Sequence, residues 1–511
     1  MDNSSKKWLI ALSVSMGGSM SSLDTFILYV ATPNLRGVFS ATIAEVSWIS
    51  TSYAIASLIC MFLSSWSVER FGSKTVYQAG LILFVVGSTF CAMAQSLDQL
   101  ILSRVIQGMG AGLLLPVEGI ILRRTFPPSQ HGLIMGLYGT SIMLGPAFGP
   151  MLGGILIDNY SWQFIFIVNI PIGIISFIMV REFLRNDEAK EVNKKLSLDV
   201  PGISLLAIAV ISLVWLLERG DRTFWLEEKF NLILLLIAVF SWAMLFAHSM
   251  SISKPLLNFK ILQHRTFAAA NTLNFCAAFM VTGTLFVLPI YMQELLKFSP
   301  TQAGTSMAPR AFVMMLAFPL VGWLFNRVSP RILISIGLAM GVTSGVMMSN
   351  FTFETGWHDI ILPLVIQGLS AAFILGPVTT SALISIPKEQ MPSAAALEST
   401  TRLLGSTIGI AVFASVITHF ELRTWEVLRH NVTMFSTVLY KRFTGVIEFY
   451  FAETSSEIFA LEKAYRALNG RVSEQVLSVT YMNVFQLITA GFLVMVVLSL
   501  FISPKRIEVS K

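Results

Sequence analysis

The chain has 511 residues, of which 54% are hydrophobic and only 13% are charged. A soluble domain carries roughly a quarter charged residues, so this composition excludes a soluble globular enzyme and predicts an integral membrane protein. The net charge of +6 is accounted for by the Lys and Arg residues of one set of loops, and it gives no indication of nucleic-acid binding.

Apolar windows of about 20 residues, each long enough to cross the ~30 Å hydrocarbon core of a bilayer, recur along the chain. We predict an all-α integral membrane fold of fourteen transmembrane helices. Their spans are 8–32, 46–68, 75–95, 99–122, 132–156, 162–181, 200–218, 230–250, 266–292, 302–326, 331–350, 358–384, 394–418 and 481–503.

Lys and Arg are unevenly distributed between the short loops on the two sides of the predicted membrane. The cation-poor loops hold only Arg36, Arg219, Arg222, Lys229 and Lys297. Cations concentrate on the cytoplasmic side of membrane proteins, so both termini are predicted to be cytoplasmic. The expected location is the inner membrane of a cell, with multiple passes.

The first span follows two lysines and superficially looks like a signal peptide. It is too long for one, has no small-residue cleavage site and carries Asp24 within its apolar run. We therefore expect a retained membrane helix.

Two ionisable residues are predicted to lie in the outer half of the membrane. At about 1.5 Å per residue, Asp24 lies about 24 Å along the first span from Trp8. Arg104 enters the fourth span from the outside and lies at a similar depth. A charge at membrane depth costs on the order of 3 kcal/mol, so each needs a reason. We predict that Arg104 switches Asp24 between its charged and protonated forms during proton coupling; the alternative is a permanently paired structural carboxylate.

Two more charges lie next to prolines inside predicted spans. Glu118 follows Pro116 near the cytoplasmic end of the fourth span, where it either attracts a cationic substrate or has a structural role. Arg310 follows Pro309 in the tenth span, where it either caps broken backbone or faces an anionic group. The sequence leaves both choices open.

The fifth span contains the run GTSIMLGPAFGPMLGG at 139–154. On a helix its four-residue glycine spacing places Gly145, Gly149 and Gly153 on one face. A neighbouring helix approaches such a face almost to backbone contact. Pro146 and Pro150 each remove a backbone donor, which kinks or weakens the helix. The run therefore predicts a tightly packed interface that bends, or simple close packing.

The thirteenth span carries Glu398 and Arg402 one helical turn apart, in the order that favours an intrahelical pair. That structural pairing is one interpretation. The other is a role in coupling or substrate binding, because the two residues lie opposite the glycine-rich helix in the internal repeat described next.

The sequence repeats itself at an offset of about 260 residues. The tripeptide IQG occurs at 106–108 and again at 366–368, and Gly145 and Gly149 return in the run GSTIG at 405–409. Several matches at one offset predict two homologous six-helix bundles, with the seventh and eighth spans inserted between them. The predicted boundaries are 1–182 for the N-terminal bundle, 183–199 for a charged cytoplasmic linker, 200–252 for the inserted pair and 253–511 for the C-terminal bundle.

One long external loop is predicted at 419–480. It contains helix-capable runs such as 455–470, with Gly470 suited to a C-terminal cap. Two interpretations stand: a short amphipathic hairpin lying on the bundle, or an external lid or docking surface for a partner.

The order of Gly and Pro in the fifth span resembles the antiporter signature of drug:proton antiporters in the major facilitator superfamily. Every Gly and Pro of that pattern is present, namely Gly139, Gly145, Pro146, Gly149, Pro150, Gly153 and Gly154. Three further runs are similar to the fourteen-span EmrB/QacA-type branch of these exporters: LDTFILYVATP at 23–33, LSRVIQGMGAG at 102–112 and WQFIFIVNIPIG at 162–173. The resemblance covers essentially the whole chain.

The loop SWSVERFGSK at 65–74 resembles the cytoplasmic motif of the superfamily, with Glu69 in place of Asp and with Arg70, Gly72 and Lys74 retained. The resemblance implies that these four residues form a cytoplasmic gating loop. It also assigns Arg104 and Gln107 to the motif of the fourth span, and Gln107 becomes a candidate for substrate binding or coupling.

The resemblance implies a secondary active transporter and no enzyme activity. The expected function is proton-coupled export of hydrophobic or amphipathic compounds as multidrug efflux by alternating access, driven by the proton gradient without a cofactor or metal. A periplasmic adaptor and an outer-membrane channel are implied partners. The alternatives are proton-coupled transport of one metabolite, such as a siderophore or fatty acid, and a non-transporting receptor or scaffold. Cys60, Cys91 and Cys276 lie inside spans and are expected to be small core residues.

Overall fold

The computed structural model describes residues 3–127, 130–184, 199–219, 229–252, 257–325, 327–384, 386–387, 390–431, 437–454 and 456–500. Within these ranges the chain forms helices joined by short turns, and it contains no strand. The predicted all-α fold is confirmed. In a bilayer a helix satisfies its backbone groups internally, which explains why glycine-rich and proline-rich segments remain helical here.

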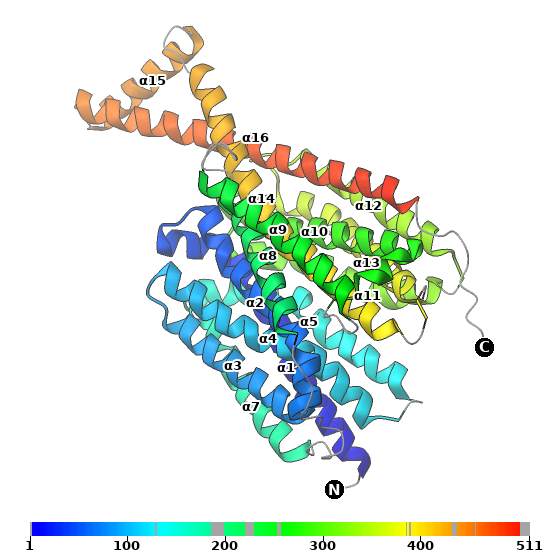
Figure 1. The fold of residues 1–511 in the computed structure, drawn as a ribbon. Helices are drawn as coiled ribbons and strands as arrows, with labels where there is room; N and C mark the ends of the chain where they lie inside the picture. Colours follow the sequence, from blue (N-terminus) through cyan, green and yellow to red (C-terminus); the bar gives the residue numbers. More distant parts are fainter. Residues whose placement is uncertain are drawn as a thin grey trace.

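The N-terminal helices form one bundle, coloured blue to cyan in Figure 1. Its members are α1 (Asn3–Phe39), α2 (Ile43–Phe71), α3 (Ser73–Met93), α4 (Leu97–Thr125), α5 (His131–Asn159), α6 (Phe164–Ile167) and α7 (Asn169–Phe183). Helix α1 packs against α5, α4 packs against α2 and α3, and α7 packs against α1 and α3.

The C-terminal helices repeat this pairing. They are α10 (Arg265–Glu294), α11 (Pro300–Phe325), α12 (Pro330–Ser349), α13 (Trp357–Ile384), α14 (Met391–Asn431), α15 (Thr437–Thr454) and α16 (Glu457–Ser499), preceded by the short helix η2 (Phe259–Gln263). Helix α10 packs against α14 as α1 does against α5, and α13 packs against α11 and α12 as α4 does against α2 and α3. The fold is thus built from two bundles of like design.

Two helices stand between the bundles in the sequence, α8 (Val200–Arg219) and α9 (Lys229–Ser251). They pack mainly against each other, and α8 also contacts α2 of one bundle and α14 of the other. Trp215 of α8 lies edge-on to Trp48 of α2, with ring centroids 5.9 Å apart. The pair therefore lies along the seam between the bundles.

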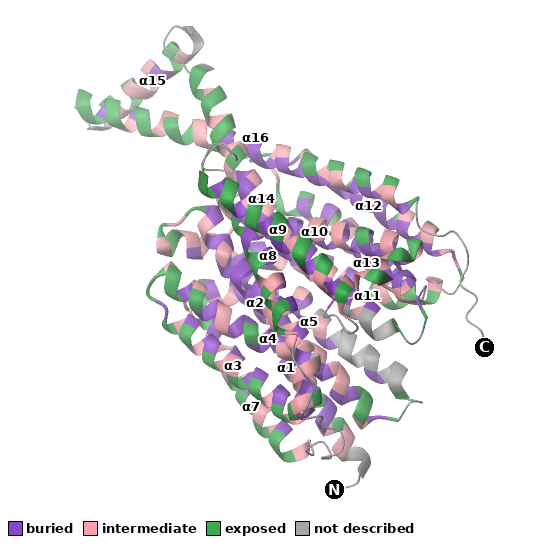
Figure 2. Ribbon diagram, viewed as in Figure 1, coloured by how far each residue is buried: buried purple, intermediate pink, exposed green. Residues whose placement is uncertain are grey.

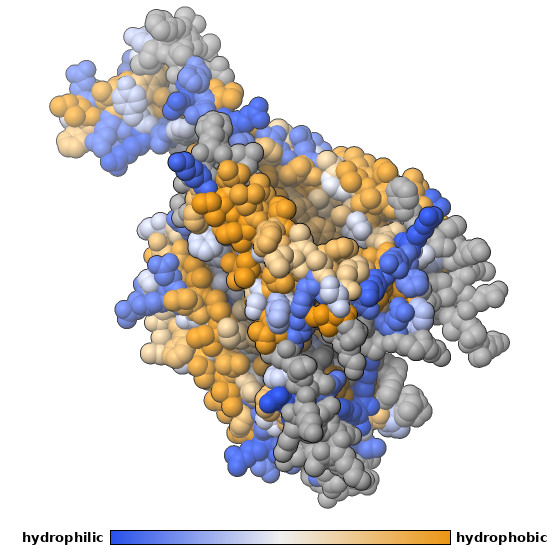
Figure 3. Space-filling model, in the orientation of Figure 1, coloured by the Kyte–Doolittle hydropathy of each residue, from blue (hydrophilic) through white to orange (hydrophobic). Residues whose placement is uncertain are grey.

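Twelve helices among the described residues are long and apolar enough to cross a membrane. Helices α1 and α5 are not among these twelve, although both pack inside the N-terminal bundle. The predicted number of fourteen is reached only when these two are added, so it stays a prediction. Large apolar side chains are exposed, as at Leu236, Val239 and Phe240 of α9. Figure 2 shows exposed residues along the outer helices. Figure 3 shows hydrophobic residues spread over the body of the molecule, as expected of a surface that faces lipid.

Helix α14 is 41 residues long and α16 is 43, so both continue well past the bundle. With α15 they form a projection, here called the arm, made of the described residues of 419–480 (Figure 1). The arm extends away from the bundle instead of lying along it. Gly470 is inside α16 and ends no helix, so its predicted role as a C-terminal cap is wrong.

Candidate functional site

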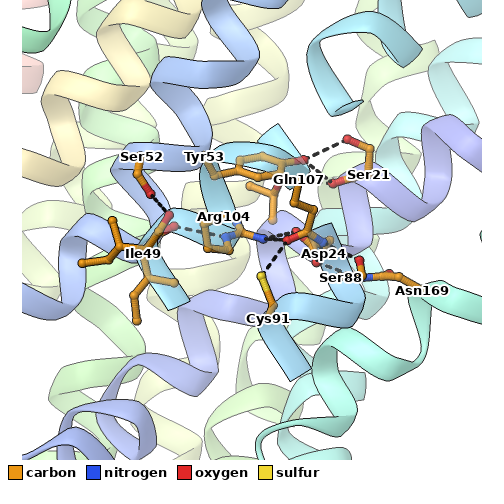
Figure 4. A network of polar contacts seen from close by, with 12 residues as sticks. Ser21, Asp24, Ile49, Ser52, Tyr53, Ser88, Cys91, Arg104, Gln107 and Asn169 are labelled. Carbon is orange, nitrogen blue, oxygen red and sulfur yellow. Dashed lines mark hydrogen bonds and ion pairs between the residues drawn. The ribbon is translucent and has the colours of Figure 1, made fainter. Parts of the chain in front are cut away.

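The centre of the N-terminal bundle contains a buried ion pair between Asp24 of α1 and Arg104 of α4 (Figure 4). The Arg104 Nη1 donates to Asp24 Oδ2 at 2.5 Å, and both residues are at most 2% exposed. The two residues lie 80 positions apart in the sequence, yet counting along their helices predicts the same depth. The structure brings them into contact.

Two amide side chains complete the coordination of the Asp24 carboxylate. Gln107 Nε2 and Asn169 Nδ2 donate to Asp24 Oδ1 at 2.8 and 2.7 Å. Gln107 Nε2 also donates to Ser88 Oγ of α3, and its Oε1 accepts from Arg104 Nη1 at 2.7 Å. Donors from α4 and α7 therefore hold the carboxylate of α1, and Ser88 extends the network to α3.

Arg104 is itself held on its other side by α2. Its Nε donates to the carbonyl of Ile49 at 3.1 Å, and its Cζ lies 4.0 Å from the centroid of the Tyr53 ring. The Tyr53 hydroxyl pairs with Ser21 Oγ of α1 at 3.0 Å. The guanidinium thus keeps the Ile49 carbonyl and the Tyr53 ring as partners if Asp24 is neutralised. A proton on the Asp24 carboxylate can therefore break the ion pair while Arg104 still has partners.

The glycine face of α5 lies directly against α1. A Cβ added at Gly145 would stand 2.0 Å from Ser22 Oγ, one at Gly149 would stand 2.8 Å from the Phe26 Cβ, and one at Gly153 would stand 2.9 Å from the Ile27 carbonyl oxygen. Only glycine allows this approach, and the α1 segment it contacts is the one that carries Asp24.

The other signature residues of α5 face different neighbours. Pro150 and Gly154 pack against the start of α11: a Cβ at Gly154 would stand 2.3 Å from the Pro300 carbonyl oxygen, and one at Gly304 would stand 2.1 Å from that of Pro150. Pro146 is half-buried within α5, and Gly139 lies outside the residues whose side-chain surroundings are described. Helix α5 therefore joins α1 to the C-terminal bundle.

The predicted gating loop forms the sharp turn between α2 and α3. Gly72 has φ 85°, a backbone conformation that favours glycine, and its N–H donates to the Val68 carbonyl. Lys74 Nζ donates to the carbonyls at the end of α7, at 2.9 and 2.7 Å. The Arg70 guanidinium lies over the Trp66 ring, and Glu69 is exposed. Of the four residues, Gly72 allows the sharp turn, and Lys74 connects the turn to the end of α7.

In the C-terminal bundle Glu398 has partners that the intrahelical prediction did not include. Its Oε1 accepts from Asn274 Nδ2 of α10 at 2.8 Å and from Thr379 Oγ1 of α13 at 2.9 Å. Arg402 Nε is 3.9 Å away and its side chain is 52% exposed. Glu398 of α14 therefore contacts α10 and α13 by hydrogen bonds, and these contacts are shorter than its contact with Arg402.

Two candidate residues are buried without an ion-pair partner among the described residues. Arg310 of α11 is 2% exposed, and its Nε and Nη2 have no hydrogen-bond partner. Glu118 of α4 is fully buried, and its Oε2 has none. Neither residue contacts the Asp24 network.

The two bundles contact each other at the end that the charge pattern predicts to be external. Arg36 of α1 forms an ion pair with Glu294 of α10, and Gln293 Nε2 donates to the Val30 carbonyl at 2.9 Å. Asp158 of α5 accepts from the first turn of α11 at 2.8 Å. Sequence reasoning did not identify these contacts, because they join helices from different bundles.

Sequence reasoning also missed Asn169 and Ser88 as members of the Asp24 site. Asn169 is the Asn of the run at 162–173, and an amide within the apolar segment after Gln163 was the available signal. No sequence signal identified Ser88, because serine is common in membrane helices.

Residues 14–410 match the sequence profile of the Major Facilitator Superfamily. The chain is 28% identical over 430 residues to the multidrug export protein EmrB of Escherichia coli, covering 84% of this chain and 83% of that protein. It is 26% identical over 432 residues to the fatty acid resistance protein FarB of Neisseria gonorrhoeae, covering 84% and 85%. Its fold is similar to a bacterial homologue of the lysosomal transporter Spinster in an inward-facing, unoccupied conformation, with a TM-score of 0.63, 16% identity and 99% of both chains covered.

Proposed function

Because the chain belongs to the Major Facilitator Superfamily, we propose that it is a proton-coupled exporter of hydrophobic or amphipathic compounds that works by alternating access. It is a transporter and not an enzyme. The observation that carries the proposal is the Asp24–Arg104 pair, in which a buried carboxylate of α1 is held by donors from α4 and α7.

Proton binding at Asp24 supplies the coupling. A proton from outside neutralises the carboxylate, and Arg104 then loses its ion-pair partner while it keeps the Ile49 carbonyl and the Tyr53 ring. The loss of this attraction changes how α1 sits against α4. Proton release to the cytoplasm restores the pair, so one conformational cycle moves protons inward and substrate outward.

The glycine face transmits that change. Helix α5 contacts the α1 segment of Asp24 on one side and α11 of the other bundle on the other side. A shift of α1 therefore moves α5 at its contact with α11 of the other bundle. We propose that the bundles rock about this contact, with the substrate bound between them.

The arm supports a partnership with an adaptor protein. It projects from the end predicted to be external, and it exposes large apolar side chains, including Phe449, Ile458 and Phe459. Exposed apolar surface away from the membrane marks a protein contact site. We propose that in a Gram-negative inner membrane, with both chain termini in the cytoplasm, this surface binds a periplasmic adaptor that leads to an outer-membrane channel.

A second candidate function is export of one metabolite with an acidic group. FarB is named for fatty acid resistance, and the buried Arg310, with two unbonded donors, favours an anionic group in the C-terminal bundle. On this proposal multidrug and fatty acid export share the same coupling site and differ in the compound that binds between the bundles.

The test uses purified protein in proteoliposomes with an imposed proton gradient. Ethidium serves as an amphipathic cation and oleate as a fatty acid, and proton movement is followed with an internal pH dye. The wild type is expected to exchange protons for one of the two probes, and Asp24→Asn is expected to abolish the exchange. Asp98→Asn, an exposed position of α4, is the matched control and should transport normally. Proton-linked transport by Asp24→Asn at the wild-type rate would refute the coupling role.

A further inference from the structure

We propose that Glu118 is a second proton-binding site of the N-terminal bundle and that it holds a proton in the conformation described. The inference rests on the proposed proton coupling, but it concerns a different residue in a different environment. Glu118 is on α4, on the opposite side of the Asp24 network from the end predicted to be external.

The surroundings of the Glu118 carboxyl favour its neutral form. The group is fully buried, its Oε1 accepts from Ser141 Oγ of α5 at 3.3 Å, and Ser15 of α1 is its other polar neighbour. Its Oε2 has no hydrogen-bond partner among the described residues. A buried carboxylate without a cation costs several kcal/mol, and a bound proton removes that cost.

Among the residues whose surroundings are described, no charged group of the neighbouring helices replaces the missing cation. Helix α1 carries no charge between Lys7 and Asp24, and α5 carries none between His131 and Asp158. The charges on α2, α3 and the rest of α4 lie near helix ends or in the Asp24 site. They are Glu45, Glu69, Arg70, Lys74, Asp98, Arg104, Arg123 and Arg124. The tyrosines of the packed helices are Tyr29, Tyr53, Tyr77 and Tyr138. The Tyr53 hydroxyl pairs with Ser21, and Tyr77 donates to the Val14 carbonyl.

The space around Oε2 suits a proton and excludes an organic cation. A Cβ added at Gly18 of α1 would stand 1.9 Å from Oε2 and 2.9 Å from the carboxyl carbon. The carboxyl group is therefore pressed against the α1 backbone at a position without a side chain. An ammonium group of a substrate does not fit there unless α1 moves.

The internal repeat allows Glu118 to be compared with the equivalent position of the C-terminal bundle. The match of residues 106–108 with 366–368 places Val378 at the position equivalent to Glu118, whereas the match of Pro116 with Pro377 places Thr379 there. Val378 is fully buried. Neither Val378 nor Thr379 is acidic, so the carboxyl of Glu118 has no equivalent in the other bundle.

The location of Glu118 connects it to the proton pathway. Gly18 lies about 9 Å from Asp24 along α1, toward the end predicted to be cytoplasmic. A proton that leaves Asp24 for the cytoplasm passes this level. Loss of the Glu118 proton leaves a bare carboxylate between α1, α4 and α5, and hydration of that carboxylate requires these helices to separate. Deprotonation of Glu118 thus favours opening on the cytoplasmic side.

Infrared spectroscopy of reconstituted protein tests the assignment without any substrate. The carbonyl band of a protonated carboxylic acid is resolved from carboxylate bands, and it is recorded across a pH series. The wild type is expected to show this band at neutral pH, and Glu118→Gln is expected to lose it. Asp24→Asn and Glu398→Gln should retain it, which assigns the band to one residue. If Asp24→Asn transports normally but Glu118→Gln loses the band, the proposed coupling residue fails and the second site stands.

Ser141→Ala provides an independent check if Glu118→Gln inserts poorly. Removing the hydroxyl that donates to Oε1 should shift the frequency of the band without abolishing it, because the proton remains and a hydrogen bond is lost. An unchanged band in both variants would overturn the proposal, since the protonated group would then be elsewhere. Absence of the band in the wild type across the neutral range would also overturn it.

Discussion

Three buried carboxyl groups of this chain have different neighbours and therefore different expected roles. Asp24 has a guanidinium and two amides, Glu398 has an amide and hydroxyls, and Glu118 has hydroxyls alone. Only the first is paired closely with a buried cation. The role of each group is thus fixed by residues of other helices, which the position of a carboxyl in its own span does not reveal.

Removing Arg104 is expected to cost more than removing both members of the pair. Arg104→Ala leaves the Asp24 carboxylate without its cation, and such a change costs about 3–5 kcal/mol. The double variant Asp24→Ala, Arg104→Ala leaves no bare charge and should be more stable than Arg104→Ala. Denaturant unfolding in detergent micelles measures the cycle. Additive effects of the two substitutions would show that the residues do not interact.

Lysine at position 104 is expected to rescue only part of the function. It keeps the charge, but it lacks the planar fork that reaches Asp24, Gln107 and the Ile49 carbonyl together. Proteoliposome transport should be lower for Arg104→Lys than for the wild type and higher than for Arg104→Ala. Equal activity of the lysine variant and the wild type would mean that charge alone is sufficient.

At the scale of the helices, α5 links the proton site to the other bundle. One side of it touches the α1 backbone around Asp24, and the other touches the start of α11. Four-residue glycine spacing predicted such an interface, and the sequence was informative here because close approach requires glycine itself. It did not identify α1 as the partner, because any neighbouring helix satisfies the spacing.

A bulky residue in this face is expected to block transport. Gly149→Leu places a side chain where the Phe26 Cβ lies 2.8 Å from an added Cβ, and overpacking of this kind costs about 1–3 kcal/mol. Gly119→Leu on α4 is the matched control, since a Cβ there meets nothing within 4 Å. Transport in proteoliposomes should be lost in the first variant and kept in the second. Normal transport by Gly149→Leu would show that α1 and α5 need not stay close.

The inserted helices α8 and α9 are expected to be dispensable for part of the activity. Each bundle has its full set of paired helices without them, and α8 meets the bundles only along the seam. A variant in which a flexible linker joins residue 182 to residue 252 should insert and retain reduced transport. A well-inserted deletion variant with no transport at all would show that the pair is integral to the cycle.

At the scale of the whole molecule, hydropathy located the bundles but not the full length of their helices. The predicted spans end at 418 and begin again at 481, whereas α14 and α16 continue through both points into the arm. A hydropathy window detects where the chain leaves lipid, and a helix does not have to end there. Hydropathy could not predict the contacts between the bundles either, because these contacts depend on the conformation that the transporter occupies.

The Arg36–Glu294 ion pair is expected to hold the bundles together at the end predicted to be external. It is partly exposed, with side-chain exposures of 34% and 15%, so its contribution is about 1 kcal/mol, which changes a two-state ratio about fivefold.

Spin labels at positions 40 and 297, in a background without native cysteines, report the separation of α1 and α10. Arg36→Glu should increase the population with the longer distance, and the charge exchange Arg36→Glu with Glu294→Arg should restore the wild-type distribution. Because Tyr481 Oη also donates to Glu294 Oε2 at 3.2 Å, the single substitution leaves one contact of this group intact. A distance distribution that does not change in Arg36→Glu would place the closing force in the remaining contacts, those of Gln293 and Asp158.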